Sequence, residues 1–290
     1  MKKVHIITDS TSDISQELAM VLGIDVIPLS VNIEGVDYID GFTISNQEFF
    51  EKLRNSKVLP KTSAPSPKAF LDAINKYPSN EEILIMTISS DVSGTYNSAK
   101  LAVDELNRGN IVLLDTRQAT IGLHALVQSA VIFRNQGDNL KTIVSKVKEI
   151  STRIVVQAAF EDLKYLRMGG RLPFIQAALG TVINLKPIIT MKDGVVHAHS
   201  KTVGMKRALN YLVRNLEKNA VDYTLPTFIG HTDNLEMFEK FKSFIKYVKP
   251  EFPLDSTASI GLTVGTHAGP GCVGIVYFTK EKNNNERDNT

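Results

Sequence analysis

The chain has 290 residues, of which 43% are hydrophobic and 22% charged, the composition of an ordinary globular protein. The formal net charge is only +2 and there is no dense basic run, so a nucleic-acid partner is not expected. The single cysteine, Cys272, excludes an internal disulfide, and the apolar stretch after Lys3 is too short for a signal peptide, which indicates a cytoplasmic protein.

The longest segment without a charged residue covers 256–279, but five glycines, Pro270 and His267 interrupt it. In lipid these breaks would leave backbone groups without hydrogen bonds, so the segment predicts a buried loop and strand, not a membrane span.

Through the first half of the chain, short apolar runs alternate with segments of helical period, which is typical of a parallel βαβ sheet. We expect a strand at 4–8, a helix over 14–22 capped by Ser12 or Asp13, and a returning strand over 25–33 that ends in a hairpin turn around Gly35. A helix over 46–54 follows, and Ser66 before Pro67 predicts the start of another.

The next elements continue this alternation. They are a strand at 83–89, a turn at 90–94, a helix at 95–107, a strand at 111–115, two helices between 118 and 150 that are separated at 136–138, a strand at 153–160 and a short helix ended by Gly169. A further helix is predicted over 171–185, closing near Gly180.

The remainder of the chain is α/β as well. Strands at 185–191 and 195–201 pair around Asp193 and Gly194, and a helix at 205–218, a strand at 226–231 and a helix at 235–248 follow. The sequence therefore predicts an α/β fold of two lobes, 1–160 with a mostly parallel sheet and 161–280, and a disordered tail at 281–290.

The turn Ser93, Gly94, Thr95 lies between a strong strand and a helix. Its N–H groups and hydroxyls would point from a helix N-terminus into the crevice above the sheet, which is an anion site, although a plain helix cap fits the spacing equally well. Thr62 and Ser63 lie in a proline-flanked loop without charge between Lys61 and Lys68, and either face inward or stabilise the loop through local hydrogen bonds.

His267 stands in the segment GTHAGPGCVG, where glycines and a proline predict a tight loop before an apolar strand. The pattern G-x-G-x-x-G at 269–274 precedes a strand and does not open a helix, which excludes a dinucleotide site. His197 and His199 would share one face of a strand, but a third ligand is not evident, so we expect no metal and no cofactor.

Arg171 follows Gly169 and Gly170 and forms a small basic patch with Lys164 and Arg167. Compensation of the helix dipole and contact with a phosphate or an acidic partner explain this patch equally well.

Six motifs in order along the chain resemble those of the DegV family: TDST at 8–11, TSAPS at 62–66, SSDVSGTYNSA at 89–99, GGRL at 169–172, LKP at 185–187 and GTHAGPG at 265–271. The resemblance runs from residue 3 to about 279. Two residues differ from the usual family pattern: Ala64 stands where glutamine is common and Thr116 where serine is usual. These differences leave open the environment of the ligand's head group and its acyl preference.

The resemblance implies a two-lobed α/β fold that holds a long-chain fatty acid such as palmitate in a tunnel between the lobes. It implies that Thr62 and Ser93 bind the carboxylate, that His267 lies near the head group, and that Arg171 faces a partner. That partner would be a fatty acid kinase, and the chain would be a carrier without a catalytic residue, touching the membrane surface transiently when lipid is exchanged.

Two other functions use the same residues. The first is a serine hydrolase acting on acyl esters, with Ser93 as nucleophile, His267 as base and Asp9 or Asp115 orienting it, although the strained G-x-S-x-G turn is missing. The second is a binder of a small phosphorylated ligand at the helix that begins near Thr95.

Overall fold

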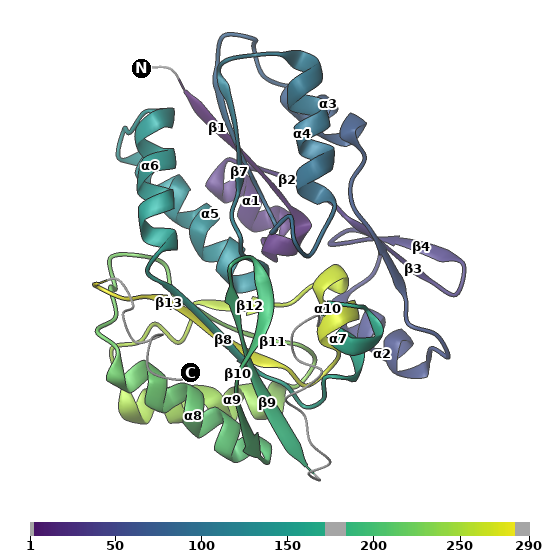
Figure 1. The fold of residues 1–290 in the computed structure, drawn as a ribbon, viewed down its shortest axis with the longest axis vertical. Helices are drawn as coiled ribbons and strands as arrows, with labels where there is room; N and C mark the ends of the chain where they lie inside the picture. Colours follow the sequence, from purple (N-terminus) through teal and green to yellow (C-terminus); the bar gives the residue numbers. More distant parts are fainter. Residues whose placement is uncertain (1–2, 172–183, 282–290) are drawn as a thin grey trace.

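The computed structural model describes residues 3–171 and 184–281, which form a mixed α/β fold built on three sheets (Figure 1). Most of the predicted helix over 171–185 and all but the first residue of the predicted tail lie outside the described residues. Within the described ranges, no helix combines the length and hydrophobicity that crossing a bilayer requires.

The first sheet is parallel, with strands in the order β2-β1-β6-β7. The strands are β1 (Val4–Asp9), β2 (Asp25–Ile27), β6 (Glu82–Thr87) and β7 (Ile111–Asp115). One face is covered by α3 (Pro67–Ile74) and α4 (Thr95–Leu106), and the other by α1 (Gln16–Leu22), α5 (Thr120–Asn135) and α6 (Leu140–Ser151) (Figure 1). Because both faces are buried, β1 and β6 are apolar on both sides, as the sequence indicates.

The second sheet is mixed, with strands in the order β10-β9-β8-β13-β11-β12. The strands are β8 (Ile154–Ala159), β9 (Leu185–Lys192), β10 (Val195–Val203), β11 (Phe228–His231), β12 (Thr257–Ser259) and β13 (Val273–Phe278). Two amphipathic helices, α8 (Met205–Lys218) and α9 (Leu235–Val248), bury their apolar faces against it. Both helices have the bounds that the periodicity predicts.

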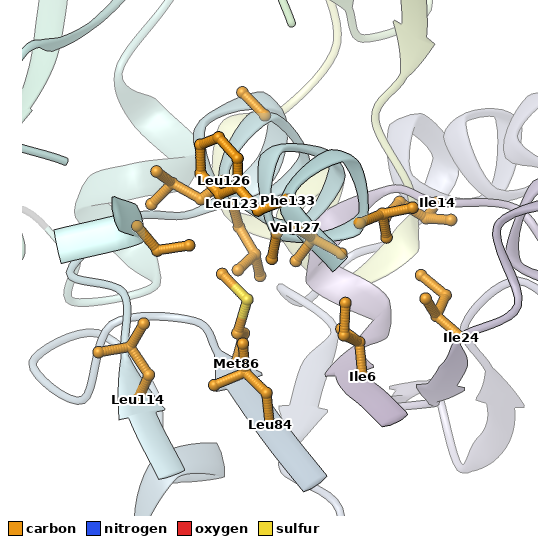
Figure 2. Close-up of a cluster of buried hydrophobic side chains, with 14 of the residues drawn as sticks. Ile6, Ile14, Ile24, Leu84, Met86, Leu114, Leu123, Leu126, Val127 and Phe133 are labelled. Atoms are coloured by element: carbon orange, nitrogen blue, oxygen red, sulfur yellow. The ribbon is translucent and has the colours of Figure 1, made fainter. Parts of the chain in front are cut away.

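Helix α5 lies between the two large sheets. Figure 2 shows Leu123, Leu126 and Val127 of α5 opposite Ile6 and Met86 from strands of the first sheet. The same core contains side chains of β13, which belongs to the second sheet. A helix buried on all sides needs apolar residues all round, and this explains why α5 is the most continuously buried helix described.

The third sheet is small and antiparallel, in the order β4-β3-β5. Its strands are β3 (Ser30–Ile33), β4 (Val36–Ile39) and β5 (Lys61–Ser63). Beside it lie α2 (Asn46–Asn55), α7 (Lys164–Met168) and α10 (Leu262–Ala268) (Figure 1). Phe49 and Phe50 of α2 pack against Val31 and against Leu262 of α10. The third sheet and its helices form a small module that brings together segments far apart in the chain.

The turn between β9 and β10 docks onto the carboxyl ends of β6 and β7. Asp193 and Gly194 have φ angles of +48° and +80°, as a tight hairpin turn requires. Ser89 Oγ donates to the Gly194 carbonyl at 2.6 Å, and the Arg117 guanidinium donates to the Asp193 carbonyl. This turn fixes the second sheet relative to the first.

Two local predictions are wrong. The strand predicted over 25–33 is two strands in different sheets, β2 and β3, with Pro28 and Leu29 between them. Neither Ser12 nor Asp13 caps the first helix: both lie at a 3-10 turn, η1 (Ser10–Ser12), and Ser15 caps α1 by accepting from Leu18 N at 3.2 Å.

The division into lobes at residue 160 stays a prediction. Strand β8 precedes that boundary in the chain and belongs to the second sheet, between β9 and β13.

Candidate functional site

A cavity of about 240 Å³ lies where the three sheets meet, and most of its lining is apolar. A single buried water needs roughly 10–15 Å³, so the space suits a larger guest. In β8, Val156 and Ala158 are partly exposed while Val155 and Ala159 are buried against the α8 side. Since Val156 and Ala158 line the cavity, their exposure is toward it, and Ile189 and Met191 of β9 extend the same apolar wall.

Thr62 and His267 bring two distant parts of the chain together in the cavity wall. Thr62 lies on β5, paired with Val31 of β3, and its Oγ1 is 3.1 Å from His267 Nε2. Both residues line the cavity. The sequence predicted each of them as a site residue, and the structure places them in contact.

The predicted tight loop around His267 is wrong, because His267 lies in helix α10. The helix ends at Gly269, whose φ of +71° lets the chain turn back past the Tyr165 ring. Gly265 sits where a side chain would press on the Phe49 and Phe50 rings. The glycines therefore let a short helix pack closely, which the sequence pattern alone does not distinguish from a loop.

The imidazole of His267 is only partly exposed and is electrically neutral at physiological pH. Burial, together with the positive charge of Arg171, lowers its pKa to about 4. Nδ1 has no hydrogen-bond partner and lies against the backbone of Gly169, where a β-carbon would collide with it. This ring can share a hydrogen bond through Nε2, but it is a poor general base.

Ser93 lies at the turn that leads into α4, as predicted. Its Oγ is 2.9 Å from Thr95 Oγ1 and accepts from Thr95 N at 3.3 Å. Gly94 is the cap residue of α4 and makes no side-chain cap, and a β-carbon on it would lie 3.9 Å from the Ala64 side chain. The turn therefore meets the loop after β5, and Ser93 and Gly94 line the same cavity as Thr62.

Two of the predicted ligand-binding residues are not among the lining residues. Ser63 follows Thr62 on β5 and is exposed, because neighbouring residues of a strand point to opposite faces. Thr95 is fully buried and reaches the site only through its contact with Ser93.

Arg171 lines the cavity and also an open groove of about 370 Å³ outside it. Its guanidinium donates to the Gly169 carbonyl at 2.5 Å and to the Val92 carbonyl at 3.4 Å. Ser93 and Gly94 border both spaces too. The predicted role of Arg171 toward a partner remains a prediction, but its location at the boundary between cavity and groove is clear.

The hydrolase arrangement does not form. His267 is paired with Thr62, and Ser93 with Thr95. The carboxylate of Asp9 accepts from Thr11 and from Ile88 N, and that of Asp115 accepts from Ser90. None of these groups is arranged as a nucleophile, base and orienting acid, and the low pKa of His267 counts against a base.

No group of three or more His, Cys, Asp or Glu side chains suited to a metal occurs in 3–171 or 184–281. A bulge between Ala198 and Ser200 interrupts the alternation of β10 at His199, so the shared face that the sequence predicts for His197 and His199 is not a regular strand face.

Sequence reasoning missed two residues. Thr11 lines the cavity and is part of the first motif, so its place in TDST was an available signal. Asp40 is buried at the N-terminus of α10, the helix that carries His267, and no local pattern marks it.

Three comparisons with known proteins agree. The model of the DegV family, described as uncharacterised proteins, matches residues 3–280. A DegV domain-containing protein of Caldanaerobacter subterraneus subsp. tengcongensis is 33% identical over 282 residues, which are 97% of this chain and all of the relative.

Among solved structures, a fatty-acid-binding DegV family protein of Thermus thermophilus is similar, with a TM-score of 0.86 and 28% identity, over 96% of this chain and all of that one. A DegV lipid-binding protein of Thermotoga maritima has a TM-score of 0.82 and 25% identity, over 97% and 99% of the two chains.

Proposed function

The chain belongs to the DegV family, and on this premise we propose that it binds a long-chain fatty acid in the cavity and presents the carboxylate to a fatty acid kinase. The observation that carries the proposal is the combination of a mostly apolar cavity with a few polar residues in its wall, several of which are linked to one another. Thr62 contacts His267, His267 contacts Gly169, and Arg171 donates to the carbonyls of Gly169 and of the residue before Ser93.

The apolar wall supplies the affinity. Burying roughly 14 methylenes at about 0.8 kcal/mol each gives on the order of 11 kcal/mol of gross driving force, before the costs of association. A buried carboxylate opposes binding unless hydrogen bonds replace its water. The hydroxyls of Thr62 and Ser93 border the cavity and are donors suited to that task.

The donors at this site also suit a carboxylate that must react. The guanidinium of Arg171 is engaged with backbone carbonyls, and His267 is neutral, so neither forms a tight ion pair across the cavity. Two hydroxyls would satisfy the carboxylate and leave its oxygens less strongly held than a buried ion pair would. This favours a carrier that hands its ligand to an enzyme.

The open groove supports a route for the kinase. It shares Ser93, Gly94 and Arg171 with the cavity and adds the polar side chains of Asp91 and Asn97. A phosphoryl donor placed in the groove would approach the head group without crossing the apolar wall. We further propose a cytoplasmic protein that touches the membrane surface only while lipid is exchanged, since a long acyl chain is poorly soluble in water.

A cavity-filling variant tests binding. In Ala158→Phe the new ring occupies the apolar wall, and we expect delipidated protein to lose measurable palmitate binding in isothermal titration. The matched control is Ala198→Phe, which adds the same ring to an exposed position of β10, and it should bind as the wild type does. Undiminished binding by a folded Ala158→Phe protein would show that the ligand lies elsewhere.

The presentation step has a separate test. Loaded protein, ATP and a bacterial fatty acid kinase are combined, and acyl phosphate is measured as its hydroxamate. We expect Ser93→Ala to lower acyl phosphate formation more than it lowers palmitate retention. Equal formation by wild type and variant at equal loading would contradict the role assigned to Ser93.

A further inference from the structure

The carboxylate of Asp40 is almost completely buried and has three donors around it. Leu262 N donates to Oδ1 at 3.0 Å, while Thr263 N and Ser10 Oγ donate to Oδ2 at 3.3 Å and 3.0 Å. Asp40 itself is 3% exposed. The two N–H groups belong to the first turn of α10, so Asp40 holds the N-terminus of that helix, beside Asp13, whose Oδ1 accepts from Gly261 N at 2.9 Å.

Asp40 is anchored to the module that carries Thr62. It directly follows β4, which pairs with β3, and β3 pairs with β5 through Val31 and Thr62. The backbone N–H of Asp40 donates to the Leu29 carbonyl at 3.0 Å, just before β3 begins. The carboxylate is therefore fixed to the same small sheet as the Thr62 hydroxyl.

Helix α10 carries the other half of the head-group pair. From its start at Leu262 it places His267 in its last turn, with Nε2 3.1 Å from Thr62 Oγ1. Thr62 and His267 are thus connected in two ways. They contact each other directly, and they are linked indirectly through the small sheet, Asp40 and α10. Any shift of α10 along its axis would open that contact.

We propose that Asp40 is a positioning residue of the fatty acid site: by holding the start of α10 against the small sheet, it sets the spacing between Thr62 and His267. The inference rests on the proposed function for its ligand, but the spacing itself is a property of the empty protein.

A carboxylate suits this position because its oxygens only accept hydrogen bonds, and every donor here is an N–H or O–H group. An asparagine would place its own N–H₂ group against one of them. Gly261 leaves room for the arrangement, since a β-carbon there would lie 2.9 Å from Asp40 Oδ1. Burial raises the pKa of Asp40, while its hydrogen bonds act in the opposite direction.

The first arm of the test compares two ligands with the same tail, palmitate and methyl palmitate. We expect Asp40→Asn to weaken palmitate binding about tenfold, the scale of losing one hydrogen bond to a charged group, and to change the binding of methyl palmitate by less than about threefold. Ser10→Ala, which removes one donor to Asp40, should act in the same direction and more weakly, and it serves if Asp40→Asn does not fold.

The matched control is Asp222→Asn, which makes the same chemical change at a carboxylate that accepts from Thr224 and Arg153 and does not line the cavity. Its ratio of the two affinities should equal that of the wild type. If Asp40→Asn weakens both ligands equally, the carboxylate only supports the fold and the inference is overturned.

The second arm needs no lipid. The ring ¹⁵N signals of His267, identified by their loss in His267→Gln, should shift in ligand-free Asp40→Asn and stay in place in Asp222→Asn. Unshifted signals in Asp40→Asn would refute the positioning role. If the wild type binds neither ligand, the proposed function fails, while the ¹⁵N signals still decide the role of Asp40.

Discussion

Replacing Thr62 by valine removes one hydroxyl from the head-group site and preserves the shape of a β-branched side chain on β5. The hydroxyl contacts His267 Nε2 and lines the cavity, and in the proposed complex it is the donor that we assign to the carboxylate. A hydrogen bond to a charged group contributes about 1.5–3 kcal/mol. We therefore expect Thr62→Val to weaken palmitate binding by about 10- to 150-fold.

The assay is titration of delipidated protein with palmitate and with methyl palmitate, whose ester cannot carry the charge. Methyl palmitate should lose less than about threefold, because the apolar wall is unchanged. Thr257→Val, the same substitution at an exposed position of β12, is the control and should bind both ligands as the wild type does. Equal weakening of acid and ester by Thr62→Val, or no weakening of either, would refute the assignment of the carboxylate to this hydroxyl.

Three further predictions follow from close packing and burial. Gly169→Ala should weaken palmitate more than methyl palmitate in the same titrations, because a β-carbon there meets the imidazole of His267; unchanged affinities would show that the ring position does not matter. Gly194→Ala should lower the free energy of unfolding in urea by about 1–2 kcal/mol or more, because φ is +80°, whereas Gly109→Ala, in open space, should have a much smaller effect; equal effects would contradict this. Burial raises the pKa of Asp9 to about 6, so its carboxyl favours the folded state below about pH 4, and this contribution is lost as pH rises through 6, by about 3 kcal/mol in all and about 2 kcal/mol between pH 4.5 and pH 7. Urea unfolding at pH 4.5 and pH 7 should show this decrease in the wild type and a smaller one in Asp9→Asn; identical decreases would contradict the shifted pKa.

Local signals predicted the regular elements well. Ser66 before Pro67 starts α3, Gly169 ends α7, and the pair Asp193 and Gly194 forms the hairpin turn. In each case one or two neighbouring residues decide the backbone conformation, so a short stretch of sequence is sufficient.

Elements that depend on distant partners were predicted less well. His267 lies in a helix whose first N–H groups are held by Asp40, more than 200 positions earlier in the chain. The first helix starts late because the carboxylate of Asp9 draws the next residues into a 3-10 turn. The carboxylate that holds the start of α10 is thus remote in the chain, whereas η1 and α1 are capped locally by Asp9 and Ser15.

The candidate site residues are assigned from the ordered motifs and are not derivable from spacing. Thr62 and Ser63 have the same local environment in the sequence, yet only Thr62 lines the cavity, since the pairing of β5 with β3 decides which of them turns inward. Arg171 was expected to face a partner, and the structure adds its contacts with the Gly169 and Val92 carbonyls at the cavity boundary.

The central claim, a fatty acid in the cavity, is tested most directly by native mass spectrometry of the protein as purified from bacterial cells, followed by extraction and identification of any released ligand. We predict an added mass in the range of long-chain fatty acids in the wild type, and its loss in Ala158→Phe but not in Ala198→Phe. A clean apo mass for the wild type, or a phosphorylated small molecule in place of a fatty acid, would contradict the account.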